Sequence, residues 1–375
     1  MSTKISQNLN ISLIQMLKIV KQFPIFGQYT YVNTAASGLM YDDLLDWRQE
    51  HDLDFLIGGS NLKLKAHKMI GDTRETVGRF FSCKTENVAL VPNFSIGLNM
   101  LLEGFDRQHR VLLLEGDYPS LNWPFESRGF PIVKIPVDAN LEDHILQAVK
   151  NDGITVVALS IVQWLNGIKV DLEFLKGLKE QFPELIIIAD GTQFCGTESF
   201  DFGASGIDIM GASAYKWLLG GYGNGFFMFK EDIEQHFAVK TIGFNSSGLN
   251  AKDNEIPFVK LLEPGHLDTY NFGSLKFSLD FLDRIGMDQI TAQLQRLSIL
   301  AKAEFSKLGL LEEAVISRKA HSTIFNLKGD EKLLQQLAQE DVICSLRGDG
   351  IRVSFHFYNT EKDIHKIVKI IRAMA

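Results

Sequence analysis

A lysine and an aspartate in the middle of the chain have the residue types and surroundings of reactive groups. Lys216 lies between a tyrosine and a tryptophan in SAYKWLLGGYGNGFFMF (213–229), although lysine is normally a surface residue. Asp190 ends the apolar run ELIIIAD, where a carboxylate without a partner would be costly. A lysine amine can attack a carbonyl group, and a buried carboxylate favours a neighbouring cation. The competing interpretation of Asp190 is that it only caps a nearby helix.

Seven short apolar runs predict the element that positions these residues. They occupy residues 87–92, 110–115, 132–137, 154–160, 184–190, 208–213 and 225–229. Most are rich in β-branched residues and hardly alternate with polar ones, which is typical of strands buried on both faces of a mostly parallel sheet. Helical patterns such as SIGLNMLLEGF and VDLEFLKGLKEQF separate several of them. The sequence therefore predicts a doubly wound α/β domain, which binds ligands at the carboxyl ends of its strands.

Polar and aromatic residues follow these runs. Asn93 or Ser95 can begin a helix whose free N–H groups bind an anion, although capping alone explains most such residues. Tyr118 can cover a flat ligand, although an aromatic residue there is more often simply packed. Together with Lys216 and Asp190, they suit pyridoxal phosphate (PLP). The lysine would form a Schiff base with its aldehyde, and the aspartate would keep its ring nitrogen protonated.

The rest of the chain predicts a second, smaller α+β domain. We expect a large PLP-binding domain at 31–260, with a seven-stranded, mostly parallel sheet. The small domain would combine 1–30 and 261–375. Within it, residues 274–309 read as one long helical stretch. STIFNL, DVICSL and GIRVSF read as strands, and EKDIHKIVKIIRAMA reads as a closing helix. Residues 240–257 are rich in Gly, Asn and Ser and read as a loop.

Composition narrows the function classes. The chain has 375 residues, of which 45% are hydrophobic and 22% charged, and its net charge is −8, so no broad basic surface for nucleic acid is expected. Three cysteines without CxxC spacing indicate a reducing compartment, with neither a disulfide frame nor a zinc site, and no metal is expected. The first 20 residues lack the pattern of a signal peptide and fit a short amphipathic helix around Leu13–Val20. No run approaches the ~20 apolar residues of a membrane span, so we expect a cytoplasmic protein.

On these residues the chain resembles the class V aminotransferase family of fold-type I PLP-dependent enzymes. That family includes cysteine desulfurases, kynureninase and isopenicillin N epimerase-like proteins. The resemblance extends from YVNTAASGLM (31–40) to RVSFHFYNTEKDI (352–364). Its most specific pieces are ADGTQ (189–193), SAYKW (213–217) with its glycine tail, and IRVSFHFYNTEKDI. It implies an amino acid substrate and a homodimer with shared active sites.

The resemblance also implies roles for individual residues. Lys216 corresponds to the Schiff-base lysine, Asp190 to the partner of the pyridinium nitrogen, and Arg352 to the arginine that pairs with a substrate α-carboxylate. Guanidinium–carboxylate geometry makes the last role plausible independently. The other implied cofactor contacts are Phe94 through its backbone amide, Ser95, Tyr118, Gln163, Gln193, Ser213, Tyr215 and, from a segment that reaches the neighbouring subunit, His266. Asn33 and Ala36 are the implied substrate contacts, with Thr34 and Ala35 beside them at the mouth.

Departures from the family pattern bear on the reaction. Desulfurases carry a nucleophilic cysteine on a loop shortly before the carboxylate-binding arginine. Here CSLRGDGIR (344–352) is too short for such a loop, and Cys344 is expected within a strand. Trp164 stands where desulfurases have an asparagine. We therefore expect an aminotransferase, with a PLP-dependent lyase or epimerase as the alternative.

Three other interpretations are weaker. A nucleotide enzyme is disfavoured because GGYGNG (220–225) precedes a strand instead of joining a strand to a helix. A binding protein that has lost its chemistry would have no need of Lys216, Asp190 and Arg352 together. An α/β protein with a merely exposed lysine must treat the agreement of these signals as coincidence.

Overall fold

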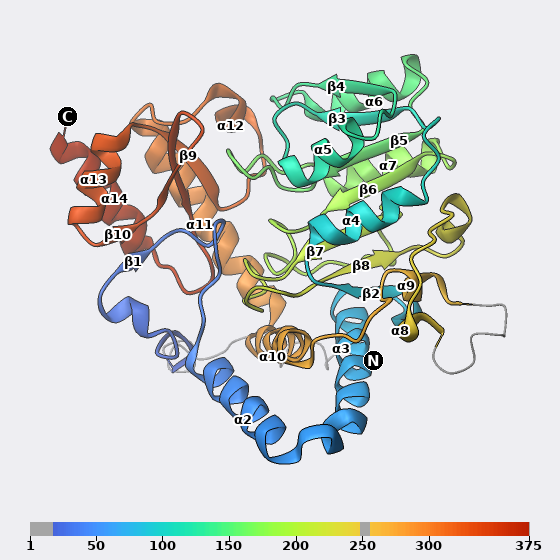
Figure 1. Ribbon diagram of the computed structural model, residues 1–375. Helices are drawn as coiled ribbons and strands as arrows, with labels where there is room; N and C mark the ends of the chain where they lie inside the picture. Colours follow the sequence, from blue (N-terminus) through green and yellow to red (C-terminus); the bar gives the residue numbers. More distant parts are fainter. Residues whose placement is uncertain (1–17, 248–255, 375) are drawn as a thin grey trace, which may run out of the picture.

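A seven-stranded sheet forms the centre of the computed structural model, which describes residues 18–247 and 256–374 (Figure 1). Its order is β2-β8-β7-β6-β5-β3-β4. Only β8 runs antiparallel to its neighbours. The strands are β2 (Val88–Val91), β3 (Val111–Leu114), β4 (Ile132–Ile135), β5 (Val156–Ser160), β6 (Ile186–Asp190), β7 (Ile209–Ser213) and β8 (Gly225–Phe229). All seven predicted strands and the mostly parallel sheet are confirmed.

Helices cover both faces of this sheet, because its strands are apolar on both sides. In β2, Val88 and Leu90 belong to one hydrophobic core, while Ala89 and Val91 belong to the other. The smaller core lies under α4 (Phe94–Glu103), α5 (Pro119–Glu126) and α9 (Phe258–Leu261). The larger core lies under α3 (Lys63–Phe81), α6 (Leu141–Asn151) and α7 (Leu172–Gln181), and it continues into the C-terminal part of the chain.

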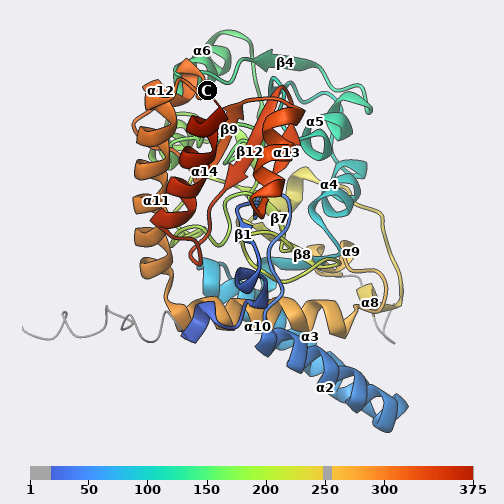
Figure 2. The same cartoon turned by 90° about the vertical axis from the view of Figure 1, so that its left-hand side faces the viewer.

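The predicted single helix over 274–309 is wrong, because the chain turns at Gly286. This glycine has a φ of 93°, a left-handed backbone conformation that other residues rarely adopt. It separates α10 (Thr269–Ile285) from α11 (Met287–Lys307). α10 packs against α3 and against α2 (Asp42–Gly58). α2 extends away from the body of the molecule (Figure 2).

The C-terminal part contains a second, antiparallel sheet of order β11-β12-β9. Its strands are β9 (Ile324–Lys328), β11 (Ser345–Arg347) and β12 (Gly350–Ser354), and the closing helix is α14 (Glu361–Met374). DVICSL is not one strand as predicted. Its first half is β10 (Val342–Ile343), which pairs in parallel with β1 (Thr30–Tyr31), whereas its second half is β11. The segment around β1 thus packs with the C-terminal strands, and the division into two domains stays a prediction.

The remaining described elements are short. They are η1 (Pro24–Gly27), η2 (Gly59–Leu62), η3 (Thr85–Asn87), η4 (Ile233–His236), α8 (Phe244–Ser247), α12 (Glu313–Ser317) and α13 (Glu331–Gln339). α8 lies inside the predicted loop 240–257, whose residues 248–255 lie outside the described part, as does most of the predicted N-terminal helix. None of the described helices combines the length and apolar character that crossing a membrane requires.

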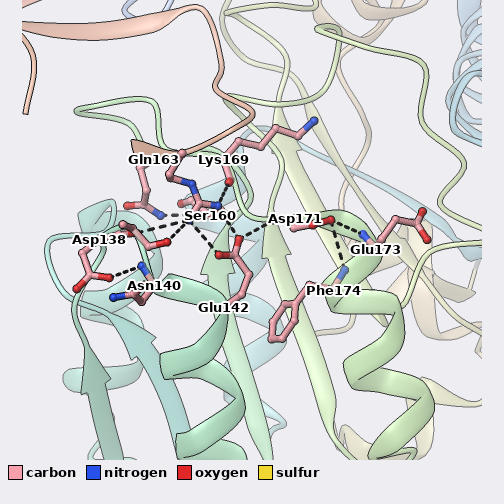
Figure 3. A network of polar contacts seen from close by, with 11 residues as sticks. Asp138, Asn140, Glu142, Ser160, Gln163, Lys169, Asp171, Glu173 and Phe174 are labelled. Carbon is pink, nitrogen blue, oxygen red and sulfur yellow. Dashed lines mark hydrogen bonds and ion pairs between the residues drawn. The ribbon is translucent and has the colours of Figure 1, made fainter. Parts of the chain in front are cut away.

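A polar network ties the segment after β5 to the C-terminal part of the chain (Figure 3). Asp171 caps α7 by accepting hydrogen bonds from the N–H groups of its first turn. The Asp171 N–H donates to Glu142 Oε1 at 2.9 Å. Arg318, which follows α12, donates to the same carboxylate at 2.6 Å and to Lys169 O at 2.7 Å. Figure 3 also draws Ser160, which ends β5, and Gln163, which donates to Ser160 O at 3.3 Å.

Candidate active site

Six of the predicted residues, Phe94, Ser95, Tyr118, Asp190, Ser213 and Tyr215, line a cavity of about 350 Å³ at the carboxyl ends of β2, β3, β6 and β7. Such ends are the usual ligand site of open α/β sheets. Its lining residues are Pro92, Asn93, Phe94, Ser95, Tyr118, Ser120, Asp190, Thr192, Ser213, Tyr215, Tyr222 and Gly223. Lys216 Nζ lies 5.4 Å from the ring centroids of both Tyr118 and Tyr215.

Backbone hydrogen bonds fix the loop that carries Lys216, between β7 and β8. Gly38 N–H donates to Tyr215 O at 2.8 Å, and Leu219 N–H donates to Lys216 O at 3.2 Å. Leu219 has a φ of 58°, so the chain turns sharply just after the lysine. The His356 ring donates from Nε2 to Trp217 O at 3.0 Å. The lysine backbone is therefore anchored from both the N-terminal and the C-terminal segments.

The Lys216 amine is poised to be neutral. Its side chain is buried, with an exposed fraction of 5% for the residue, and among the described residues Nζ makes no hydrogen bond. Burial lowers the pKa of Lys216 well below its usual value, and the positive charges of Arg352 and Arg347 lower it further. The Asp190 carboxylate opposes this shift in part. A neutral amine is the nucleophilic form that reacts with an aldehyde.

Asp190 ends β6 and is held by a local turn. Its Oδ1 accepts a hydrogen bond from the Thr192 N–H at 2.8 Å, and Thr192 Oγ1 in turn accepts from the Ser213 N–H at 3.0 Å. Asp190 therefore does act as a cap, but it caps a turn and not a helix. Burial raises the pKa of Asp190 above its usual range. A cation placed against this carboxylate would reverse that shift.

The first turn of α4 forms the anion-binding end of the cavity. Asn93 is the capping residue and accepts from the Ile96 N–H at 2.9 Å, which settles the choice between Asn93 and Ser95. The Phe94 N–H donates to Ser213 Oγ at 2.9 Å. Ser95 and Ser213 both line the cavity, so hydroxyl and amide donors of two strand ends converge at a helix N-terminus.

Aromatic rings form the walls of the cavity. Tyr215 stacks on Tyr222 with ring centroids 4.6 Å apart. Tyr118 packs edge-on against Trp164 at 5.8 Å, and the Trp164 indole donates to Gly116 O at 3.0 Å. Three tyrosine rings along the lining suit a flat, aromatic ligand.

Two glutamines predicted as cofactor contacts are engaged with the protein. Gln193 donates to Ala35 O at 3.0 Å and accepts from Trp217 Nε1 at 2.7 Å. Gln163 donates to Ser160 O at 3.3 Å. Neither lines the cavity. In this geometry Gln193 supports the lysine loop through Trp217, and direct cofactor contacts of both glutamines stay predictions.

Asp117 is a buried acid that the sequence analysis did not single out. It immediately precedes Tyr118, accepting from the Tyr118 N–H at 2.7 Å and from the Ser160 N–H at 2.8 Å. Its negative charge raises the pKa of Asp190. Its position shortly after a strand could have predicted Asp117 as a site residue, just as the same position predicted Tyr118.

Arg352 enters the site from β12. Its Nη1 donates to Trp164 O at 2.7 Å, while its buried Nε has no hydrogen-bond partner among the described residues. Burial lowers the pKa of Arg352 to about 10, which leaves it charged near neutral pH. An unpartnered donor on a buried guanidinium is the feature that an anionic ligand would satisfy.

The segment after β1 lies beside Arg352, but not all of it forms a mouth. Asn33 and Ala36 are partly exposed, and Asn33 Oδ1 accepts from Ser345 Oγ at 3.0 Å. Thr34 and Ala35 are buried, with exposed fractions of 0% and 1%. Their predicted place at the mouth is wrong, because Thr34 Oγ1 bonds the Tyr358 hydroxyl inside the core.

Two further residues considered in the sequence lie outside the cavity. His266 stacks on Phe244 and lines two other cavities, one of which also borders α2, so a role in the site requires a second subunit. Cys344 follows β10 and is half-buried against the larger core. Burial raises the pKa of Cys344 to about 11, which is the opposite of an activated thiolate.

PLP fits these residues. The cavity has a buried carboxylate for a ring N–H, aromatic side chains for a pyridine ring and a helix N-terminus with two serines for a phosphate, and the buried Lys216 amine for an aldehyde lies behind its Tyr118 and Tyr215 rings. The orphaned guanidinium nitrogen of Arg352 is a further donor beside this set. Each group suits a different part of the same molecule.

Comparisons with known proteins agree with this fit. A family model described as aminotransferase class-V matches residues 55–367. The chain belongs to the class V aminotransferase family. The predicted family, fold type and PLP cofactor are thereby confirmed, and the protein is a PLP-dependent enzyme of this family.

Individual relatives of this class V member are distant. A probable cysteine desulfurase of Methanothermobacter thermautotrophicus is 19% identical, with 95% of this chain and 97% of that protein covered. The uncharacterized aminotransferase YcbU of Bacillus subtilis is 20% identical, with 94% and 96% covered. A solved structure of the enzyme C-DES, with glycine covalently linked to its PLP cofactor, superposes with a TM-score of 0.82 at 18% identity, covering 93% of this chain and 98% of that one. At these identities the likeness to C-DES supports the fold alone.

Proposed function

We propose that the protein is an aminotransferase that acts on an α-amino acid. The single observation that carries this is the buried amine of Lys216, which makes no hydrogen bond within the described residues and lies within electrostatic reach of the buried Asp190 and Arg352. An amine with a lowered pKa is suited to take a proton from the substrate Cα and return it elsewhere. Transamination needs such a transfer, and it needs no further side chain as a nucleophile.

In this proposal PLP supplies an electrophilic carbonyl and an electron-accepting ring when it is bound. Lys216 Nζ would hold the cofactor's aldehyde carbon in the resting enzyme and would then move a proton at the substrate Cα. The Asp190 carboxylate would face the ring nitrogen and favour its protonated form, and Tyr118 would cover the ring. Arg352 holds the substrate carboxylate with a bidentate pair of hydrogen bonds, which fixes the orientation of Cα.

A PLP-dependent lyase is the second candidate, because the M. thermautotrophicus relative is named a probable cysteine desulfurase. A desulfurase that forms a persulfide needs an exposed, activated cysteine. The free cysteines are Cys83, Cys195 and Cys344, of which Cys195 is buried and the other two are partly buried. Burial is the main cause that raises the pKa of each of the three. This distribution favours transamination over persulfide chemistry, while an epimerase on the same scaffold stays the remaining alternative.

The proposed transamination is tested with a panel of amino acids, by measuring both the product made from the amino acid and the form of the cofactor. The PLP-loaded protein is mixed with single L-amino acids without an acceptor, and the products are separated. We expect a keto acid and pyridoxamine phosphate in equal amounts. Release of alanine, sulfide or ammonia with unchanged PLP would identify a lyase instead, and inversion of the Cα centre without either product would identify an epimerase.

We also propose that the active unit is a homodimer. The second half of α2 exposes Leu53, Phe55, Leu56 and Ile57, with exposed fractions of 54%, 63%, 78% and 84%. Contiguous apolar side chains on a protruding helix are typical of an interface. His266 and α2 line the same cavity of about 660 Å³, so the segment that the family pattern assigns to the neighbouring subunit lies close to this face.

Light scattering after size-exclusion chromatography tests the dimer. We expect twice the mass of the 42.2 kDa chain, and Ile57→Asp should shift the protein toward that single-chain mass. Ile299→Asp is a matched control, since Ile299 is 72% exposed but lies on α11. A wild-type protein of single-chain mass at micromolar concentration would contradict the proposal. The cytoplasmic location stays a prediction.

A further inference from the structure

A second arginine faces the site from the same sheet as Arg352. In the β11–β12 hairpin, Ser345 pairs with Arg352, and Arg347 pairs with Gly350. Side chains two residues apart on a strand point to the same face of a sheet. Arg347 is therefore on the face of Arg352 and is its diagonal neighbour across the hairpin, a separation of about 7–8 Å that long side chains bridge.

The hairpin packs against the segment that follows β5, and this segment borders the site. Arg352 Nη1 reaches Trp164 O at 2.7 Å. The next residue along, Leu165, packs against Gly348 in the turn of the hairpin, so that a Cβ on this glycine would come within 3.2 Å of the leucine. Arg347 is the residue before Gly348. Its charge therefore lies at the entrance to the space in front of Arg352.

Neither of these arginines has an acidic partner among residues 18–247 and 256–374. Arg347 donates only to Leu346 O, at 3.1 Å. Arg347 is exposed and Arg352 is buried, whereas the partly buried Arg74 and Arg318 each lie 2.6 Å from a glutamate. Asp349 lies in the hairpin turn but forms no ion pair with either arginine.

This arrangement concentrates positive charge. The charge of Arg347 lowers the pKa of both Arg352 and Lys216, so all three groups lie within electrostatic reach of one another. Two like charges on one sheet face repel each other. The repulsion is relieved when anions bind between and beside them.

We propose that Arg347 binds a second acidic group of the substrate, so that the enzyme prefers α-amino acids whose side chain ends in a carboxylate. This rests on the proposed function, in which Arg352 takes the α-carboxylate. Arg347 then takes the side-chain carboxylate from the solvent side. It is a specificity-determining residue and plays no part in the proton transfer at Cα.

The test compares acidic amino acids with their amides, which have nearly the same shape. For the wild-type enzyme kcat/KM is measured with L-aspartate, L-asparagine, L-glutamate and L-glutamine. We expect at least one acid to exceed its amide by about 10- to 100-fold, the range for a hydrogen bond to a charged group. Arg347→Gln should lower that ratio by the same factor, whereas Arg352→Gln should lower kcat/KM for acid and amide alike.

Arg110→Gln is the matched control. Arg110 is exposed and precedes β3, at the sheet edge opposite to the site, so the acid-to-amide ratio should not change. An acid-to-amide ratio near one in the wild-type enzyme would overturn the inference while leaving transamination intact. An unchanged ratio in Arg347→Gln would do the same.

A binding measurement keeps the inference testable if no amino acid in the panel is turned over, which would defeat the proposed function. Titration calorimetry of the PLP-incubated protein with succinate, glutarate and butyrate gives dissociation constants without chemistry. We expect a dicarboxylate to bind about 10-fold or more tightly than butyrate, and this advantage should disappear in Arg347→Gln. Equal binding of mono- and dicarboxylates would refute the role of Arg347.

Discussion

Replacing Gly38 by alanine tests whether the lysine loop is held from the N-terminal segment. Gly38 lies directly against the backbone of the loop, and a Cβ at this position would be 2.0 Å from Lys216 O and 2.9 Å from Leu219 Cδ2. Real Cβ contacts are essentially never shorter than 3.0 Å. The two segments would therefore have to separate by about 1 Å, which also stretches the hydrogen bond from Gly38 N–H to Tyr215 O.

Two magnitudes follow from this shift. Overpacking of this kind costs about 1–3 kcal/mol of stability, which lowers the unfolding temperature by several degrees. A displacement of about 1 Å at a catalytic group costs about 100-fold in rate. The loss of activity in Gly38→Ala should therefore be much larger than the loss of folded protein.

The assay measures thermal unfolding together with the rate at which the cofactor's visible absorbance develops on adding PLP. Gly177→Ala is the control, because nothing lies within 4 Å of the added Cβ and the residue is in α7. This control should gain about 0.5–1 kcal/mol of stability and react like wild type. If Gly38→Ala unfolds and reacts like wild type, the proposed support of Lys216 by the Gly38 segment is incorrect.

Three further predictions concern buried charges. Asp190→Ala should remain folded but bind PLP more weakly and turn over amino acids about 100-fold or more slowly; wild-type turnover would remove the electrostatic role of Asp190. Glu263→Gln should cost about 3–5 kcal/mol in urea unfolding, because the fully buried Glu263 carboxylate accepts from Arg74, Lys260 and the Leu90 N–H. Glu231→Gln, at an exposed ion pair, should leave the midpoint unchanged, and equal effects would contradict the reasoning. Burial lowers the pKa of His356 to about 3 from an ordinary 6.5, so between these pH values the unfolded chain binds more protons and stability falls as pH falls, by about 1.4 kcal/mol per unit. Urea unfolding of His356→Gln should show a shallower slope between pH 6 and 5, and a slope equal to that of wild type would refute this contribution.

The central sheet could be predicted from the sequence because its strands are apolar on both faces. Runs such as ELIIIAD leave little choice of structure, and the residues that follow the parallel strands fall at the same sheet edge. Asp190 and Tyr118 were found in this way, whereas Lys216 was found from its apolar neighbours. Asp117 follows the same rule and was missed because Tyr118, beside it, offered a more specific chemistry.

Breaks in regular structure and long-range supports were harder to predict. Gly286 interrupts a helical pattern that is otherwise continuous, and only its left-handed backbone shows that two helices form. The division of DVICSL between two sheets depends on pairing with Thr30–Tyr31, more than 300 positions away. His356 and Gly38 support the lysine loop from distant parts of the chain, and no local pattern predicts such contacts.

The most direct test of the account is whether Lys216 is the residue that binds PLP covalently. The wild-type protein and Lys216→Ala are incubated with PLP, reduced with borohydride, digested and examined by mass spectrometry. We expect a phosphopyridoxyl group on Lys216 in the wild type, and a folded Lys216→Ala protein without the visible absorbance band and without the modified peptide. A wild-type protein that carries the group on another lysine, or no group at all, would contradict the assignment of the active site.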